Sequence, residues 1–384
     1  MTRLLIVDDS ALMRRLLTQI FSAAGDFEIA TARDGNEAIG QLTAFAPDVV
    51  TLDVHMPGMD GLTVLDRIMV ERPCPVVMVS SLTEDGAEET LEAMALGAVD
   101  FFPKPRGAVS LAIAEVAPEL VETVRGAAKA RISRALRLTD KVRFRAGAAE
   151  GLARAKAPVR PRRAAPRPVA PRQTGPVADR DETDGSPSPD AVPAERLILI
   201  GISTGGPPAL DVLLEALPAQ FPAAILIAQH MPASFTGPLA RRLDRLCALP
   251  VSEVTAATPL LAGHVYIGRG DADLIVSKRG GALVVLPAPS SPDHHWHPSA
   301  DRLVQSAMAH VEPQALTGVL MTGMGADGAK AMTALRQAGG YTIAEAAETA
   351  VIWGMPGALV AAGGAAIILP RERIAASLVK RVRQ

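Results

Sequence analysis

Short apolar runs that alternate with amphipathic stretches constrain the fold of this chain more than any other feature. Residues 4–7, 49–52 and 76–79 are apolar runs, apart from Thr51, that are each followed by a polar residue. Residues 12–21 repeat their apolar side chains at helical spacing. Alternation of this kind predicts a parallel sheet with right-handed crossovers. The chain is 48% hydrophobic but only 3% aromatic, which suits Val, Ile, Leu and Ala strands buried on both faces.

The same alternation returns near Arg196. The segments RLILIGIS, AAILIAQH and ALTGVLMTG predict three further strands, residues 264–286 predict β-hairpins, and the end of the chain predicts a strand and a closing helix. We therefore expect an α/β protein with two domains. The first is a (βα)₅ domain, and the second is a doubly wound, mostly parallel α/β/α domain with a β-hairpin region.

The segment between the two domains has a different composition. Residues 125–172 hold many Lys and Arg but only two acidic residues, residues 158–193 hold nine prolines, and residues 179–195 are acidic. Such a stretch buries too little apolar surface to offset its ordering entropy, which predicts a flexible linker. The predicted division is a first domain at 1–120, a linker at 121–192 and a second domain at 193–384, although residues 120–138 have some helical character.

Charge and cysteine content exclude several classes of protein. A formal net charge of −2 does not suggest a nucleic-acid binder. Cys74 and Cys247 are far apart and form neither a disulfide framework nor a zinc pattern, which fits a reducing compartment. Two aspartates interrupt the start of the chain where a signal peptide needs its apolar centre, and no apolar run approaches the roughly 18 residues of a membrane span. We expect a cytoplasmic protein without membrane insertion.

Carboxylates follow two of the predicted strands of the first domain. Asp8 and Asp9 end one strand and Asp53 ends another, so the three should meet at one sheet edge. Three carboxylates repel one another unless a hard cation neutralises them, and Mg²⁺ prefers oxygen ligands. Lys104 and Ser80 at further strand ends complete a set that can accept a phosphoryl group. The alternative, that each aspartate is only a helix N-cap, is reasonable for one of them but not for the set.

Residues 1–106 resemble a response-regulator receiver domain. The resemblance lies in VDDS, in LDVHMPGMDG, in VMVSS and in the Lys104-Pro105 pair after GAVDFF. It implies Asp53 as the phosphoacceptor, a histidine kinase as phosphodonor, and Mg²⁺ held by Asp8, Asp9, Asp53 and the His55 carbonyl. It also implies a cis bond before Pro105 and a switch role for Ser80, Lys104 and Phe101.

A hydroxyl, an imidazole and a carboxylate follow strands of the second domain. Ser203 lies in G-x-S-x-G between a predicted strand and a helix, His230 ends the next strand, and Asp327 follows a third. Together they fit the roles of nucleophile, base and orienting group. Singly, each has a simpler explanation: a glycine-rich turn or phosphate loop, a histidine bonded to a carbonyl, and a helix cap. The order Ser, His, Asp differs from that of the α/β-hydrolases.

Residues 196–384 resemble the methylesterase domain of the chemotaxis protein-glutamate methylesterases, the CheB family. The segments that carry the resemblance are IGISTGGP, AQHMPASFTGPLARRL, HPSADRL, LTGVLMTGMGADGAKAM and IWGMPGALVAAG. The resemblance implies the catalytic set Ser203, His230 and Asp327, an oxyanion role for Met324 beside Thr204, and Arg241 and Arg242 near the substrate cleft. The long basic linker, the GRGDADL segment and the HHWH cluster depart from the family pattern.

The resemblance implies a phosphorylation-activated enzyme that hydrolyses glutamyl methyl esters on chemoreceptors, releases methanol and also deamidates glutamines. It needs Mg²⁺ for phosphorylation and no cofactor for hydrolysis, and its partners are the methylated receptor and a chemotaxis histidine kinase. Two alternatives remain from the sequence: a phosphorylation-dependent binding module without catalysis, and a DNA-binding regulator supported only by the basic linker. The three histidines of HHWH suggest a metal site, but no carboxylate–cysteine framework accompanies them.

Overall fold

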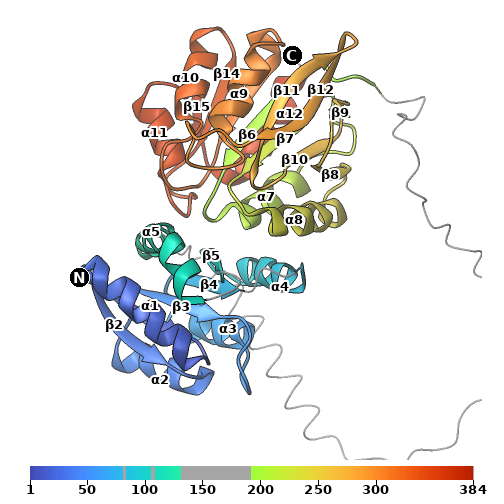
Figure 1. Cartoon of the computed structure of the whole chain (residues 1–384). Coiled ribbons are helices and arrows are strands. Elements are labelled where there is room, and N and C mark those ends of the chain that lie inside the picture. Colours follow the sequence, from blue (N-terminus) through green and yellow to red (C-terminus); the bar gives the residue numbers. More distant parts are fainter. Residues whose placement is uncertain (81–83, 105–108, 131–191, 384) are drawn as a thin grey trace, which may run out of the picture.

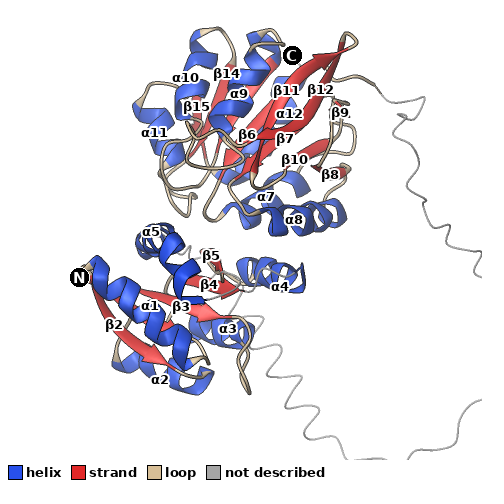
Figure 2. Cartoon of the chain, viewed as in Figure 1, coloured by secondary structure: helices blue, strands red, loops and turns tan. Residues whose placement is uncertain are grey.

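Two α/β domains make up the part of the chain that the computed structural model describes, which is residues 1–80, 84–104, 109–130 and 192–383. Figure 1 shows one domain built from the N-terminal residues and one from the C-terminal residues, and Figure 2 shows that each is a central sheet between helices. Nearly all of the predicted linker lies outside the described residues.

The N-terminal domain has the predicted parallel five-stranded sheet, in the order β2-β1-β3-β4-β5. The elements alternate strictly between strand and helix: β1 (Thr2–Val7), α1 (Ala11–Ala24), β2 (Phe27–Ala32), α2 (Gly35–Ala44), β3 (Val49–Asp53), α3 (Gly61–Glu71), β4 (Val76–Ser80), α4 (Glu84–Ala95), β5 (Asp100–Pro103) and α5 (Val109–Ala128).

Successive strand residues of this sheet point to opposite faces, which gives the domain its two helical layers. Leu4 and Ile6 of β1 share a core with α1 and α5, whereas Leu5 and Val7 share a core with α2, α3 and α4. Because both faces are covered, the central strands are apolar on both sides, as expected for a parallel sheet.

The C-terminal domain has a seven-stranded sheet in the order β15-β14-β13-β6-β7-β10-β8, and all of its strand pairs are parallel. The elements of this part of the chain are β6 (Leu197–Ile202), α7 (Gly206–Glu215), β7 (Ala224–Gln229), α8 (Ala233–Leu246), β8 (Val251–Val254), β9 (Thr258–Pro259), β10 (Val265–Gly268), β11 (Ala272–Arg279), β12 (Ala282–Pro289), α9 (Ala300–Met308), η1 (Pro313–Ala315), β13 (Leu316–Leu320), α10 (Ala329–Gln337), β14 (Tyr341–Glu345), α11 (Met355–Ala361), β15 (Ile367–Leu369) and α12 (Arg371–Val382).

Different elements cover the two faces of this sheet. Alternate residues of β6 pack on one side against α7, α8 and α12, and on the other against α9, α10 and α11. The predicted hairpin region is the antiparallel sheet β11-β12-β9, and Leu274 and Val285 join it to the second of these cores. The doubly wound architecture and the closing strand and helix are therefore confirmed.

The two domains share one continuous apolar core. The cluster that contains Leu91 of α4 also contains Leu214 of α7 and Leu239 of α8. Figure 1 shows α4, β5 and α5 on the side of the N-terminal domain nearest the C-terminal domain. The surface where the domains meet is thus the α4–β5–α5 face of the first domain.

The first domain extends beyond the boundary predicted at residue 120. Helix α5 continues to Ala128, because Val121, Val124 and Ala127 keep its apolar face in the core with Leu120. Pro193, at the start of the predicted second domain, pairs with Leu261. Among the described residues, no helix is both long enough and apolar enough to span a bilayer.

The variant Gly61→Ala tests how tightly the backbone at the end of β3 is packed. A Cβ at Gly61 would lie 2.1 Å from the backbone oxygen of Asp53, so Gly61→Ala forces the backbone at the end of β3 to shift. We expect it to lower the free energy of unfolding of the N-terminal domain by about 3 kcal/mol. Thermal and urea unfolding of the full chain measure this.

Gly40→Ala is the matched control, since a Cβ at this position on helix α2 meets nothing within 4 Å. It should be neutral or stabilising by up to about 1 kcal/mol, because Ala favours the helix over Gly. Equal unfolding curves for the two variants would contradict the packing argument.

Candidate active site

The predicted acidic cluster forms at the carboxyl edge of the N-terminal sheet. Ligand atoms of Asp8, Asp9 and Asp53 all lie within 4.8 Å of one another. Lys104 Nζ lies 3.0 Å from Asp8 Oδ2 and 2.8 Å from Asp53 Oδ2. Asp8 and Asp53 are buried, whereas Asp9 is exposed. The chain thus brings the predicted phosphoacceptor, its acidic neighbours and the predicted lysine into one site.

The electrostatics of this cluster suit a divalent cation. Burial raises the pKa of Asp53, the nearby charge of Asp8 adds to this, and Lys104 opposes it. Burial acts to lower the pKa of Lys104, but the two carboxylates outweigh it and the net shift is upward. Three close carboxylates with one lysine leave excess negative charge, and their oxygens are the donors that Mg²⁺ prefers. The residues present therefore fit the ion.

The two remaining predicted switch residues, Ser80 and Phe101, make contacts of different kinds. The Ser80 hydroxyl, at the end of β4, donates to the Gly86 carbonyl of α4 at 3.1 Å. Phe101 of β5 is nearly buried and packs against Phe235 of α8, with ring centroids 4.3 Å apart. Phe101 is therefore an interdomain contact, which sequence reasoning did not anticipate. Pro105 lies outside the described residues.

Ser203 lies on a tight turn between β6 and α7. Its amide donates to the Thr322 carbonyl at 2.9 Å, and its own carbonyl accepts from the Gln229 side chain at 3.1 Å. Gly205 has φ 75°, a left-handed conformation that favours glycine. A Cβ on Gly206 would overlap Gln229 Oε1, so glycine at this position leaves space for the side chain that supports the turn.

His230 and Asp327 form the predicted pair. His230 Nε2 donates to Asp327 Oδ2 at 2.8 Å, and the histidine side chain is only 3% exposed. Nδ1, the other ring nitrogen, is buried and has no hydrogen-bond partner among the described residues. Because Nε2 is held by the carboxylate, Nδ1 is the nitrogen left to act as a base.

The Asp327 carboxylate is held by backbone amides as well as by His230. Oδ2 also accepts from the Ala300 amide at 2.6 Å, and Oδ1 accepts from the Ser299 hydroxyl and the Asp301 amide, at the N-terminus of α9. Burial acts to raise the pKa of Asp327, but these bonds and His230 hold it below its ordinary value. The carboxylate therefore stays ionised and orients the imidazole at neutral pH.

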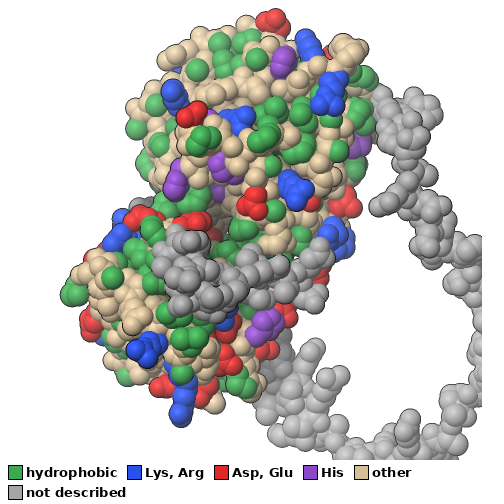
Figure 3. Space-filling model, in the orientation of Figure 1, with side chains coloured by type: hydrophobic (Ala, Val, Ile, Leu, Met, Phe, Trp, Pro, Cys, Tyr) green, Lys and Arg blue, Asp and Glu red, His purple; other side chains and the backbone are tan. Residues whose placement is uncertain are grey.

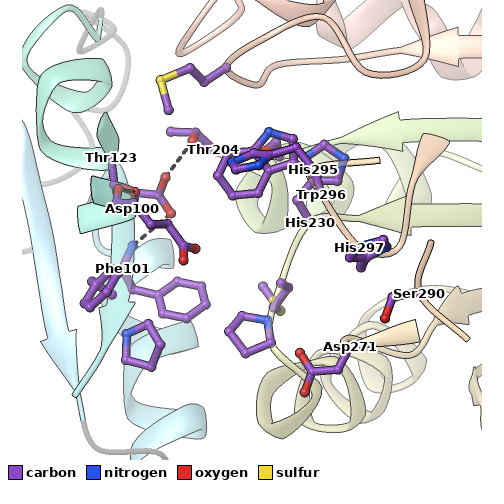
Figure 4. A pocket seen from close by; sticks show the side chains of 17 residues that line it. Asp100, Phe101, Thr123, Thr204, His230, Asp271, Ser290, His295, Trp296 and His297 are labelled. Carbon is purple, nitrogen blue, oxygen red and sulfur yellow. Dashed lines mark hydrogen bonds between the residues drawn. The ribbon is translucent and has the colours of Figure 1, made fainter. Parts of the chain in front are cut away.

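A cavity of about 330 Å³ lies between the two domains beside these residues. Ser203, Thr204, His230 and Met324 line it from the C-terminal domain, which brings four of the predicted site residues to one cleft. Figure 4 shows His230, Trp296 and His295 on one side and Asp100, Phe101 and Thr123 of the N-terminal domain on the other. Of the predicted arginines, Arg242 instead bonds Asp211 and the Leu91 carbonyl, away from this cavity.

Direct bonds join the Ser203 turn to the N-terminal domain. The Thr204 hydroxyl donates to Asp100 Oδ2 at 2.5 Å, and the Gly205 amide donates to the Val99 carbonyl at 3.1 Å. Burial raises the pKa of Asp100 to about 6, with the bonds from Thr204 and Phe101 opposing it. Nothing in the sequence around Asp100 marked it as a site residue, since its partner comes from the other domain.

Comparison with known proteins agrees with this geometry. A family model described as the CheB methylesterase matches residues 198–378, and one described as the response regulator receiver domain matches residues 4–114. The chain is 54% identical over 380 residues to protein-glutamate methylesterase/protein-glutamine glutaminase 2 of Rhodopseudomonas palustris (strain BisB18), covering 99% of this chain and 98% of that protein. It is 48% identical over 379 residues to protein-glutamate methylesterase/protein-glutamine glutaminase 3 of Rhodospirillum rubrum, covering 98% of this chain and 95% of that protein.

These matches show that the chain is a response regulator with a receiver domain and an output domain of methylesterase type. The chain belongs to the CheB methylesterase family. Both resemblances expected from the sequence are thereby confirmed.

Asp327→Asn tests the orienting role of the carboxylate. An amide keeps the shape of the side chain but favours the wrong imidazole tautomer, so we expect kcat for ester hydrolysis to fall by about 10⁴-fold. Steady-state assays on a methylated helical substrate measure this, with circular dichroism to verify folding. A loss below tenfold would contradict the orienting role.

Proposed function

We propose that this chain is a phosphorylation-activated protein-glutamate methylesterase and protein-glutamine glutaminase that acts on chemoreceptors. The observation that carries the proposal is the buried His230–Asp327 pair in the same cleft as Ser203 on its glycine turn. This arrangement suits acyl transfer through a serine nucleophile. A binding module without catalysis would have no need of an imidazole held by an ionised carboxylate.

The reaction follows from the roles of the three side chains. Ser203 Oγ attacks the side-chain carbonyl, and His230 Nδ1 takes its proton while Asp327 stabilises the imidazolium. The C–O bond to the methoxy group then breaks, the imidazolium returns the proton, and methanol leaves an acyl-enzyme. Water, deprotonated by His230, releases the glutamate carboxylate and Ser203. A glutamine follows the same course with ammonia as the leaving group.

The negatively charged oxygen of the tetrahedral intermediate needs hydrogen-bond donors. The Ser203 amide is not available, because it already donates to the Thr322 carbonyl. We assign this role to the amides of Thr204, the residue after the nucleophile, and Met324 in the loop after β13. The loop lies against the nucleophile, because a Cβ on Gly323 would be 2.7 Å from Ser203 Cβ. Glycine at 323 therefore permits the close approach of the two segments.

In the unphosphorylated protein the receiver masks this cleft. Val99, just before β5, and Asp100 of β5 bond the Ser203 turn. Helix α5 lies against the Met324 loop, where a Cβ on Gly126 would be 2.6 Å from Met324 Sδ. Residues of β5 and α5 thus form one wall of the cavity around Ser203. A receptor helix, about 10 Å wide, has to displace this wall to reach the serine.

Phosphorylation of Asp53 relieves this block through β5. Lys104, which bonds Asp53, directly follows the strand that carries Asp100 and Phe101. When bound, Mg²⁺ held by Asp8, Asp9 and Asp53 neutralises the phosphoryl group. A phosphoryl group on Asp53 draws Lys104 toward it and shifts β5, which weakens the bonds from Asp100 and Val99 to the Ser203 turn.

The partners follow from this mechanism. A chemotaxis histidine kinase supplies the phosphoryl group, and the methylated cytoplasmic part of a receptor supplies the ester. These partners place the working protein in the cytoplasm. No nucleic acid takes part.

Removal of the nucleophile tests the enzymatic proposal. Ser203→Ala should lower methanol release from methylated receptor by about 10³-fold or more, because the covalent route is lost. Gas chromatography of methanol and mass spectrometry of the receptor measure it. A matched Asp53→Asn variant should keep basal hydrolysis but lose its stimulation by a small-molecule phosphodonor. Full activity of Ser203→Ala refutes the mechanism, and normal stimulation of Asp53→Asn refutes the control by phosphorylation.

Enlarging Gly126 tests the masking. Gly126→Leu overpacks the contact between α5 and Met324, which costs about 1–3 kcal/mol, so unphosphorylated activity should rise roughly 5- to 100-fold. Gly40→Leu makes the same change on α2, where a Cβ meets nothing within 4 Å, and should leave activity unchanged. Unchanged basal activity in a folded Gly126→Leu protein would show that α5 does not restrict the cleft.

A further inference from the structure

The HHWH segment, residues 294–297, lines the cleft although the proposed mechanism assigns it no role. His295, Trp296 and His297 all border the cavity that contains Ser203 and His230. Histidine side chains lie beside the seam between the domains on the face shown in Figure 3. The segment is therefore part of the active-site wall.

A buried carboxylate anchors this segment. Asp273 of β11 accepts hydrogen bonds from His297 Nδ1 at 2.9 Å, the Ser299 amide at 2.7 Å and the Ser291 amide at 3.4 Å, and Arg302 pairs with it. Burial acts to raise the pKa of Asp273, but these donors hold it below its ordinary value. The carboxylate stays ionised and holds both ends of the segment, which fixes the position of the residues between them.

Trp296 lies against the proposed base. Its ring is nearly parallel to that of His230, with an interplanar angle of 12° and centroids 5.7 Å apart (Figure 4). His295 packs edge-on against the same indole at 4.7 Å. The indole nitrogen lies 3.9 Å from where a Cβ of Gly325 would be, so Trp296 also borders the loop that carries Met324.

The His230 ring needs a contact such as that with Trp296 to fix its orientation. Its one side-chain hydrogen bond among the described residues, from Nε2 to Asp327, holds the ring at one nitrogen only. An aromatic face parallel to the ring restricts its rotation and keeps Nδ1 directed to one place. The electron-rich face of an indole also attracts a cation, so it favours the imidazolium that forms when Ser203 loses its proton.

We propose that Trp296 is a positioning residue for the proposed ester hydrolysis: it fixes the plane of the His230 ring between Asp327 and the Met324 loop, and it stabilises the imidazolium. This inference rests on the proposed function for its kinetic consequences. The contact itself is a property of the folded chain and can be tested without a substrate.

Intrinsic fluorescence of the full-length chain tests the contact. The chain has two tryptophans, so Trp353→Phe leaves Trp296 as the single emitter. An imidazolium in contact with indole quenches its emission, so emission should fall on acidification from pH 8 to pH 5. The titratable groups around this pair are Asp327, His295 and His297 and, from the receiver, Glu119 and Asp100. Asp100 has a pKa of about 6, so the His230→Gln variant is needed to separate its effect from that of His230. Because His295 also contacts the indole, the test is made with His295→Asn added. In that background the titration should persist, and adding His230→Gln should abolish it.

Kinetics of two Trp296 variants test the role. Trp296→Leu should lower kcat roughly 5- to 30-fold with little change in KM, and should move the acidic limb of the kcat/KM profile to lower pH, because the imidazolium loses its aromatic partner. Trp296→Phe keeps an aromatic face and should restore most of the activity and of the pH profile. Thermal unfolding of both variants verifies that the segment remains folded.

Distinct results overturn this inference. In the His295→Asn background, a fluorescence titration that survives His230→Gln, or no titration at all, shows that His230 does not contact the indole. A raised KM with unchanged kcat and pH profile in Trp296→Leu makes the indole only a substrate wall. If the wild-type chain releases no methanol, the proposed function fails, and the fluorescence measurement still decides whether Trp296 contacts the base.

Discussion

The turn that carries Ser203 is held by hydrogen bonds from two domains, and the proposed control of this enzyme depends on that arrangement. Thr322 and Gln229 hold the turn from within its own domain, while Val99 and Asp100 of the receiver bond the two residues that follow the serine. A hydrogen bond adds about 0.5–1.5 kcal/mol net, so the two receiver bonds are a modest bias. A bias of this size suits the proposed release of the turn on phosphorylation.

Asp100 limits the strength of the interface between the domains. Asp100 is half-buried between the domains, and the loss of solvent around it raises its pKa to about 6, so at neutral pH the docked state holds an ionised carboxylate with few donors. Because the pKa of Asp100 is higher when the domains are docked, the protonated carboxyl favours docking. This contribution is complete below pH 3.8, the ordinary pKa, and is lost as the pH rises through about 6. The apolar contact of Phe101 with Phe235 offsets this cost. Docking is thus a small difference between opposing terms.

The parts of the site that follow strands were predictable from the sequence. Asp53, Ser203 and His230 directly follow apolar runs, and parallel strands bring such positions to one sheet edge. The end of α5 was also marked, since Val121, Val124 and Ala127 continue its apolar face, but the basic composition beyond residue 125 concealed it. Helical spacing was the better guide to that boundary than charge.

Strand β5 spans the whole distance between the proposed phosphorylation site at Asp53 and the turn that carries Ser203. Asp100 at its start bonds Thr204, and Lys104 just after its end bonds Asp53. In a strand, an insertion or deletion of one residue exchanges the two faces for every position beyond it. Such a change would break one of these two connections while the receiver kept its sheet. Substitutions in β5 can therefore be tolerated during evolution, whereas a change in its length would disconnect the two domains.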